Sequence, residues 1–139
     1  MSEEILIGVD HGEKNTGLAF GRAGLTSPLR IIQSSDTNVV ISEIARAVVE
    51  NKATKIIMGL PIGLNGSETS QSQKVRKFAK LLKIRVKRPV EFVDEFDSSQ
   101  EALQGAIKSG ISQKGRKTTD HYSAELILRR YYNEQSLED

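Results

Sequence analysis

The fold of this chain is decided by residues 5–20, Ile5-Leu6-Ile7-Gly8-Val9-Asp10-His11-Gly12-Glu13-Lys14-Asn15-Thr16-Gly17-Leu18-Ala19-Phe20. The beginning of this stretch is apolar and rich in β-branched residues, which predicts a buried strand that ends on the carboxylate of Asp10. The pleat of a strand puts Leu6, Gly8 and Asp10 on one face. The short gap between Gly12 and Gly17 is typical of a hairpin, so a second strand is expected to follow at once. Because burying an unpaired acid costs free energy, Asp10 is interpreted either as a functional carboxylate or as a cap that hydrogen-bonds the turn.

Composition limits the class of protein. The 139 residues fit one domain, expected to span residues 1–139, and 37% hydrophobic with 27% charged residues is the content of a soluble globular protein. There are no cysteines, which excludes disulfides and thiolate metal sites. We find no signal sequence and no apolar run of membrane-spanning length, so we expect a cytoplasmic protein without a membrane partner.

Positive charge is clustered along the chain, although the formal net charge is only +2. The segment between residues 74 and 88 has no acid and carries the cations Lys74, Arg76, Lys77, Lys80, Lys83, Arg85, Lys87 and Arg88. A second basic group consists of Lys108, Lys114, Arg116 and Lys117. Such clusters indicate an anionic partner, most commonly nucleic acid, and a solvated helix face is the alternative interpretation.

The rest of the chain alternates strands with helices. Strands are predicted at 16–23 and 25–34, at 55–61 and at 90–95. Helices are predicted at 38–52 with Thr37 or Asn38 as the N-cap, at 72–84, from Ser98 or Ser99 to Gly110, and from about Asp120 to Tyr132. This order predicts an α/β fold with a five-stranded mixed sheet, three antiparallel strands followed by two parallel ones, and helices on both faces.

Acidic residues fall at the ends of the predicted parallel strands, where sites form in open α/β sheets. Asp10 ends the first strand, and Asp94 and Glu95 end the last one. Neighbouring residues of a strand point to opposite faces, so only one of the pair can join a shared site; alternation favours Asp94 weakly and leaves the choice open. Asp120 begins the apolar stripe of the final helix, which brings it near Asp10 if that helix packs on the first strand. The alternative for Asp120 is an N-terminal acid stabilised by the helix dipole.

Carboxylates that converge at one place repel one another and raise one another's pKa unless a cation lies between them. Oxygen ligands without cysteine select a hard divalent ion, Mg²⁺ or Mn²⁺. Two such ions roughly 3.5–4 Å apart can position a water molecule and stabilise the leaving oxygen of a phosphodiester. The predicted chemistry is therefore metal-dependent hydrolysis of phosphodiester bonds.

Four blocks of the sequence resemble, in order, those of the YqgF family, also called RuvX or Holliday-junction-resolvase-like proteins. The blocks are Ile7-Gly8-Val9-Asp10-His11-Gly12-Glu13-Lys14-Asn15-Thr16-Gly17-Leu18-Ala19, then Gly59-Leu60-Pro61 with Asn65-Gly66-Ser67-Glu68, then Val93-Asp94-Glu95, and Lys117-Thr118-Thr119-Asp120 with Ser123-Ala124-Glu125-Leu126-Ile127-Leu128. They cover nearly the whole chain. The resemblance implies an RNase H-like fold and a metal-dependent nuclease of the bacterial cytoplasm that matures the 5′ end of pre-16S ribosomal RNA. Carried over by position, the catalytic and metal-binding acids of the family fall on Asp10, Glu95 and Asp120, which decides for Glu95 over Asp94.

Two positions depart from the family pattern. Phe96 stands where the family commonly has Arg after its Asp-Glu pair, and Lys14-Asn15 stands where it commonly has Lys-Arg. Each change removes a cation able to contact a phosphate or to orient a carboxylate. Lys14, Arg116 and Lys117 remain and can compensate.

We expect a nucleic-acid partner, either an RNA precursor or branched DNA, bound by a monomer or a homodimer. The expected contacts to nucleic acid are Lys14, Arg76, Lys80, Lys83, Lys114, Arg116 and Lys117. The leading hypothesis is an endonuclease acting on structured RNA; a resolvase of four-way DNA junctions with the same site and a binding module that does not cleave are the alternatives. An actin-like ATPase, suggested by the Asp-x-Gly turn, needs a second domain for which we find no room.

Overall fold

The computed structural model describes residues 3–63, 65–96 and 119–138, without the side chains of residues 96, 119–122 and 137–138. The strands are β1 (Ile5–His11), β2 (Asn15–Arg22), β3 (Leu25–Gln33), β4 (Lys55–Ile62) and β5 (Val90–Phe96). The helices are α1 (Thr37–Asn51), α2 (Ser70–Val86) and α5 (Thr119–Glu138). The helix expected from Ser98 or Ser99 to Gly110 lies outside the described residues. No helix in the described part of the chain combines the length and the apolar character that crossing a membrane requires.

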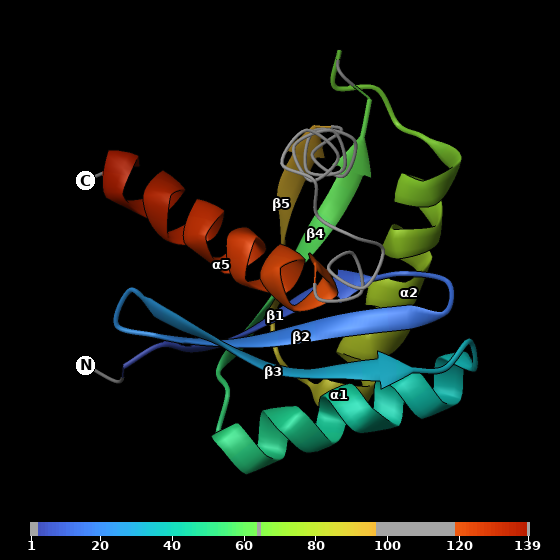
Figure 1. The fold of residues 1–139 in the computed structure, drawn as a ribbon, viewed down its shortest axis with the longest axis horizontal. Helices are drawn as coiled ribbons and strands as arrows, with labels where there is room; N and C mark the ends of the chain where they lie inside the picture. The colour runs from blue at the N-terminus through green and yellow to red at the C-terminus, as the bar shows by residue number, and fades with distance from the viewer. Residues whose placement is uncertain (1–2, 64, 97–118, 139) are drawn as a thin grey trace, which may run out of the picture.

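The sheet has the strand order β3-β2-β1-β4-β5 (Figure 1). β1 and β3 both pair with β2 in antiparallel fashion, whereas β4 runs parallel to β1 and to β5. The predicted sheet, antiparallel in its first three strands and parallel in its last two, is therefore confirmed. β1 and β4 lie in the interior of the sheet, and their carboxyl ends meet at one edge.

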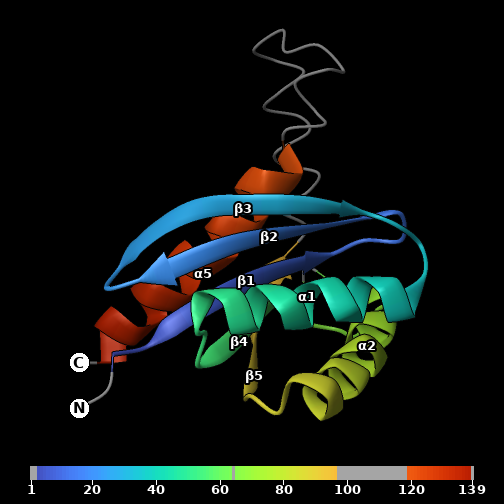
Figure 2. The same cartoon turned by 90° about the horizontal axis from the view of Figure 1, so that it is seen from below.

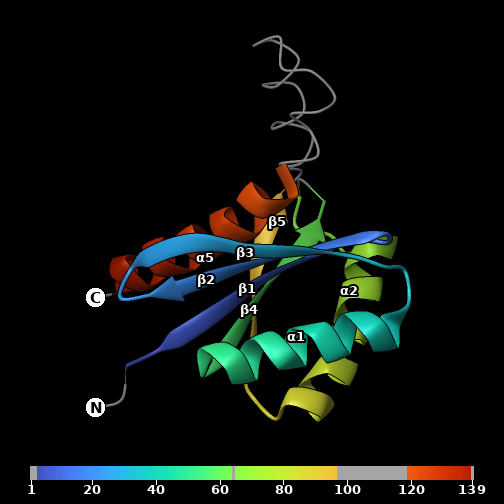
Figure 3. The same ribbon diagram turned by 60° about the horizontal axis from the view of Figure 1, so that its bottom comes forward.

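Helices cover both faces of the sheet. α1 and α2 lie on one face and α5 on the other (Figures 2 and 3). The larger apolar cluster, which includes Ile7, Val9, Ile44 and Leu82, fills the space beneath α1 and α2. A smaller cluster beneath α5 contains Leu6, Ala19, Ile57, Val93, Ala124, Ile127, Leu128 and Tyr131. Alternate residues of β1 thus belong to different clusters, as its pleat predicts.

The hairpin between β1 and β2 forms as the glycine spacing predicts. His11 pairs with Thr16, and the Gly12 amide donates to the carbonyl oxygen of Asn15 over 3.0 Å. A Cβ atom at Gly12 would lie only 2.6 Å from that oxygen, so the tight turn needs glycine.

Side-chain caps fix the beginnings of two helices. Asp36, and not Thr37 or Asn38 as predicted, is the N-cap of α1, because its carboxylate accepts from the amides of Asn38 and Val39. The α2 helix begins at Ser70, two residues before the predicted start. Thr69 caps it in a reciprocal pair with Ser72.

Candidate active site

Asp10 occupies the end of β1 on the face of the sheet that α5 covers. Leu6, four residues earlier on the same face of β1, belongs to the cluster beneath α5. Gly8 lies between them, and a Cβ atom there would be 2.9 Å from the backbone carbonyl oxygen of Ala124. The α5 backbone therefore rests directly on β1, one pleat before Asp10.

Glu95 reaches the same place from β5, although β4 separates β5 from β1. Strands lie about 4.8 Å apart, so β5 and β1 are about 10 Å from each other. Gly59 of β4 lies in the gap: a Cβ atom at this position would be 2.7 Å from Cδ and from Oε2 of Glu95. The Glu95 side chain thus lies flat across β4 over a residue that has no side chain of its own.

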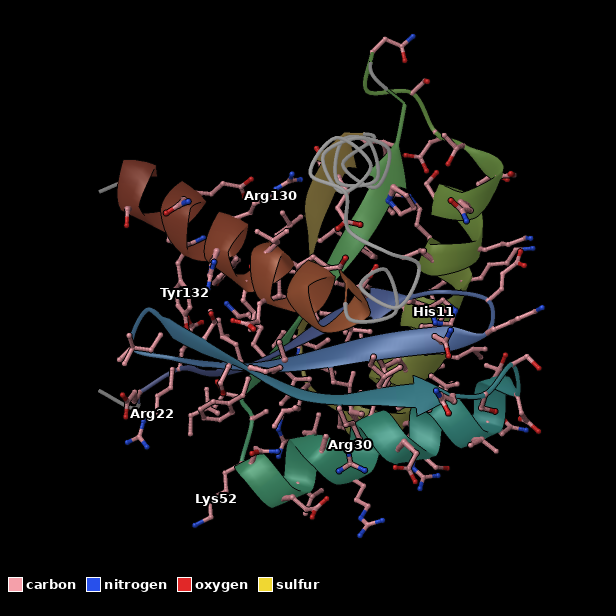
Figure 4. All side chains as sticks on the ribbon, viewed as in Figure 1. His11, Arg22, Arg30, Lys52, Arg130 and Tyr132 are labelled. Carbon is pink, nitrogen blue, oxygen red and sulfur yellow. The ribbon has the colours of Figure 1, made fainter. Side chains whose placement is uncertain are left out.

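The two carboxylates interact electrostatically. Burial, as the larger cause, and the negative charge of Asp10 together raise the pKa of Glu95 from its ordinary value of 4.5 to about 7, and the charge of Arg130 opposes the shift. Arg130 also donates from Nη1 to the backbone carbonyl oxygen of Asp94 over 3.0 Å. Figure 4 shows Arg130 on the side of α5 that looks toward β5. Burial beside Asp10 therefore favours the protonated form of Glu95 when no cation is bound.

A pocket of about 240 Å³ opens where these strands end. Its lining residues come from the ends of three strands, the β1–β2 turn and the first turns of α2: Asp10, His11, Gly12, Glu13, Gly59, Pro61, Gln71, Lys74, Val75 and Glu95. Asp10 and Glu95 are thus brought together in one concave site at the carboxyl ends of the parallel strands, although β4 lies between the strands that carry them.

Asp94 points away from this site. It is exposed, and its position in β5 shares a face with Phe92, which packs on the cluster beneath α1 and α2. The alternation of Val90, Phe92 and Asp94 weakly favoured Asp94 as the acid on the apolar face. Asp94 does share a face with these residues, but the pocket lies on the other face of β5, which carries Glu95.

Asp120 is the second residue of α5, and its side chain lies outside the described residues. The expectation that the final helix packs on the first strand is confirmed by the contact of Ala124 and Leu128 with Gly8. Among the described residues, no group of three or more acids or histidines converges as a metal-binding cluster.

The side chain of His11 is half-buried beside the pocket, on the α2 side of the sheet (Figure 4). Its ring stacks on Phe78 with centroids 3.8 Å apart, and Nδ1 lies 3.2 Å from Oγ1 of Thr16. Burial lowers the pKa of His11 below its ordinary value of 6.5. The ring is therefore neutral near pH 7 and supports the β1–β2 turn against α2.

The cations predicted to bind nucleic acid lie at different distances from the pocket. Lys14 is exposed in the β1–β2 turn, whereas Lys80 and Lys83 are exposed further along α2. Arg76 pairs with both carboxylate oxygens of Glu68, over 2.8 and 3.1 Å, and so ties the loop after β4 to α2. The remaining three predicted contacts, Lys114, Arg116 and Lys117, lie outside the described residues.

Three features of the site were not predicted from the sequence. Gly59 interrupts an apolar strand, and such a glycine is a usual sign of close approach. Lys74 lines the pocket from the second turn of α2, and only its place at the start of the basic segment could have suggested it. Arg130 carried no signal, because a charged residue on a helix is ordinarily solvated.

Comparison with known proteins identifies relatives along nearly the whole chain. A family model described as "RuvX: Holliday junction resolvase" matches residues 4–134. A "Putative pre-16S rRNA nuclease" of Methylobacillus flagellatus is 37% identical over 135 residues, which are 95% of this chain and 92% of the relative. A protein of the same name from Dictyoglomus thermophilum is 34% identical over 141 residues, 96% of this chain and 98% of the relative.

Solved structures share the fold at low sequence identity. Thermus thermophilus RuvC in complex with a Holliday junction substrate has a TM-score of 0.58 at 11% identity, covering 95% of this chain and 96% of that one. The fowlpox virus Holliday junction resolvase has a TM-score of 0.52 at 18% identity, covering 94% and 99%. The RNase H-like fold expected from the resemblance is thereby confirmed. Because the family model matches residues 4–134, this chain belongs to the RuvX family.

Proposed function

We propose that this protein is an endonuclease that uses Mg²⁺ or Mn²⁺ to hydrolyse phosphodiester bonds in structured nucleic acid. One observation carries the proposal: Asp10 and Glu95, from strands on either side of β4, meet in one pocket across Gly59 in a chain of the RuvX family. Residues 1–139 act in this proposal as one RNase H-like nuclease domain.

The donor set fits a hard divalent cation. Asp10 and Glu95 offer carboxylate oxygens, which Mg²⁺ and Mn²⁺ prefer. Burial and the charge of Asp10 both raise the pKa of Glu95, so a bound cation would favour the ionised form of this carboxyl group. We assign catalytic and metal-binding roles to Asp10, Glu95 and Asp120. The helical repeat supports Asp120, because it lies one turn before Ala124, whose carbonyl contacts the position of Gly8.

The chain supplies the geometry for the reaction. When bound, the divalent ion lowers the pKa of water and offsets the charge that develops on the leaving oxygen. Glu95 would give up its proton to solvent when the cation binds and would keep its orientation over Gly59, while Asp10 is held by the register of β1 against β2 and β4. Arg130 contacts the backbone at Asp94 and so steadies the end of β5 that carries Glu95. Preorganised carboxylates of this kind need little rearrangement when substrate binds.

For the substrate we propose the precursor of 16S ribosomal RNA, cleaved at its 5′ end, because the relatives at 37% and 34% identity carry that name. A four-way DNA junction is the second candidate, favoured by the description of the family model. The proposed backbone contacts are Lys14, Arg76, Lys80, Lys83, Lys114, Arg116 and Lys117. The protein acts in the cytoplasm, as a monomer or a homodimer.

The test is cleavage of a transcript that contains the 5′ leader and the beginning of 16S rRNA, mapped by primer extension in the presence of Mn²⁺ or Mg²⁺. Asp10→Asn and Glu95→Gln are each expected to lower the rate about 100-fold or more, because each loses several kcal/mol of transition-state stabilisation. Asp94→Asn is the matched control: it removes a neighbouring exposed carboxylate on the other face and should cleave like the unmodified protein. EDTA should abolish cleavage.

Equal cleavage by Asp10→Asn and the unmodified protein would refute the proposal, since it would mean that the activity does not arise from this pocket. Cleavage of a synthetic four-way junction but not of the transcript would assign the site to DNA. Tight binding of the transcript and of the four-way junction, without cleavage of either, would identify a binding module.

A further inference from the structure

A second pocket adjoins the candidate active site. It has a volume of about 320 Å³ and lies between the β1–β2 turn, the segment joining β3 to α1, and α2. Four residues line both pockets: His11, Gly12, Glu13 and Lys74. The β1–β2 turn and Lys74 therefore line both pockets, which lie next to each other.

The second pocket combines positive charge with hydroxyl groups. Lys74 and Lys77 line it from α2, one turn apart on the same side of the helix, and both are exposed. Ser34, Ser35 and Thr37 line it from the opposite wall. Ammonium and hydroxyl donors on facing walls are the groups that hold phosphate oxygens.

We propose that this second pocket binds a backbone phosphate of the substrate strand next to the bond that is cleaved, with Lys74 and Lys77 as its contacts. The inference rests on the proposed function for the identity of the strand. A strand seated at Asp10 and Glu95 passes over the β1–β2 turn and reaches the second pocket directly, because the two hollows share that turn. Both lysines belong to the basic segment between residues 74 and 88, but neither is among the seven individual contacts predicted from the sequence.

The position of these lysines on α2 favours them over the rest of the basic segment. Lys74 lines both pockets, whereas Lys80 and Lys83 lie about 9 and 14 Å further along the helix axis. α2 runs from the carboxyl end of β4, where Thr69 Oγ1 donates to the Pro61 carbonyl oxygen, back toward the start of β5. Its basic residues therefore recede from the site as the helix proceeds.

Glu13 competes with a phosphate for Lys74. Its carboxylate lies 3.3 Å from Nζ of Lys74, and the two side chains are 72% and 66% exposed. An ion pair so exposed is weak, so a phosphate can displace Glu13 at little cost in free energy. Removing the charge of Glu13 should free Lys74 and strengthen binding.

The experiment measures binding without cleavage. Asp10→Asn protein in EDTA is titrated against a fluorescein-labelled transcript of the 16S rRNA 5′ leader, and against a labelled four-way DNA junction, by fluorescence anisotropy over a range of salt. Lys52→Gln is the matched control, because Lys52 is exposed at the far end of α1 from His11 (Figure 4).

Lys74→Gln and Lys77→Gln should each weaken binding about fivefold at 0.1 M salt and lower the slope of log Kd against log salt by about 0.7, the contribution of one phosphate contact on a single strand. Lys52→Gln should change neither quantity, and Glu13→Gln should tighten binding. The inference is overturned if both lysine variants bind like Lys52→Gln, even where the unmodified protein cleaves the transcript normally. If the lysine variants bind more weakly, the phosphate-binding role of the second pocket is supported, whether or not the unmodified protein cleaves the transcript. Failure of the unmodified protein to cleave would refute only the proposed nuclease activity.

Discussion

The two faces of the sheet are built differently. Beneath α1 and α2, apolar side chains from both helices and from β1, β2, β3 and β4 form one cluster, and Val90 and Phe92 of β5 pack against it. Beneath α5 the cluster is small, and the helix approaches the strands at Gly8 and Gly21, where a Cβ atom would lie within 3 Å of side chains of α5. Asp10 and Glu95 lie on this second face. The larger cluster beneath α1 and α2, here called the thick layer, therefore stabilises the sheet. The smaller cluster beneath α5, the thin layer, leaves room for the carboxylates.

Gly59 shows how the thin face is organised for its site. A side chain there would collide with Glu95 and also with Ile127, whose Cδ1 would be 2.7 Å away. The same absence of a side chain therefore admits both the helix and the carboxylate. Substitutions on the two faces should accordingly separate stability from activity.

The largest expected effect is on stability, from truncation in the thick layer. Ile44 of α1 is fully buried, and Ile44→Ala should lower the free energy of unfolding by about 2–5 kcal/mol because it removes packed methylene groups and leaves a cavity. Urea denaturation measures the loss. The cleavage rate of the molecules that remain folded should be unchanged; a rate that fell in proportion would contradict the separation of the two faces.

Gly59→Ala is expected to lower stability less than Ile44→Ala does, but to lower the cleavage rate, which Ile44→Ala leaves unchanged. The added methyl group should displace Glu95, lowering the cleavage rate about 10- to 100-fold, and overpacking should cost about 1–3 kcal/mol. Ile57→Val, two residues earlier on the same face of β4, is the control for stability alone and should cost about 0.5–1.5 kcal/mol. Equal rates for the two variants would show that Glu95 does not need its place over Gly59.

The smallest effect is the dependence of stability on pH. Because the pKa of Glu95 is about 7 in the folded protein and ordinarily 4.5, the folded state holds a proton that the unfolded chain releases. This stabilisation is complete below about pH 4.5 and is lost as the pH rises through 7. In EDTA, unfolding free energy should therefore fall by about 2 kcal/mol between about pH 5 and pH 8.

Two comparisons isolate this contribution. Glu95→Gln should lack it, and Mg²⁺ or Mn²⁺ should restore stability at pH 8 in the unmodified protein but much less in the variant. Parallel pH profiles for the two proteins in EDTA would contradict the burial of Glu95 beside Asp10.

Much of this architecture was predictable because it depends on local periodicity. The pleat of β1 places Asp10 beside Leu6 and Gly8, and the structure keeps that face. The choice between Asp94 and Glu95 was not predictable from alternation, because β5 has packed apolar residues on both faces and an acid near its end on each. The N-cap of α1 was predicted one or two residues too late, since Asp, Thr and Asn all suit the N-cap position.

By itself the sequence determined the order in which the described strands and helices follow one another along the chain, the hairpin at Gly12 and the position of Asp10 at the end of an interior strand. These follow from the identity of neighbouring residues and from repeats of two and 3.6 residues. Only the tertiary structure decided that Glu95 crosses β4 to meet Asp10, that Arg130 lies near it, and that Lys74 lines the same pocket. Those contacts join segments far apart in the chain, and they depend on the order of the strands within the sheet and on how helices pack on it, which no local pattern encodes.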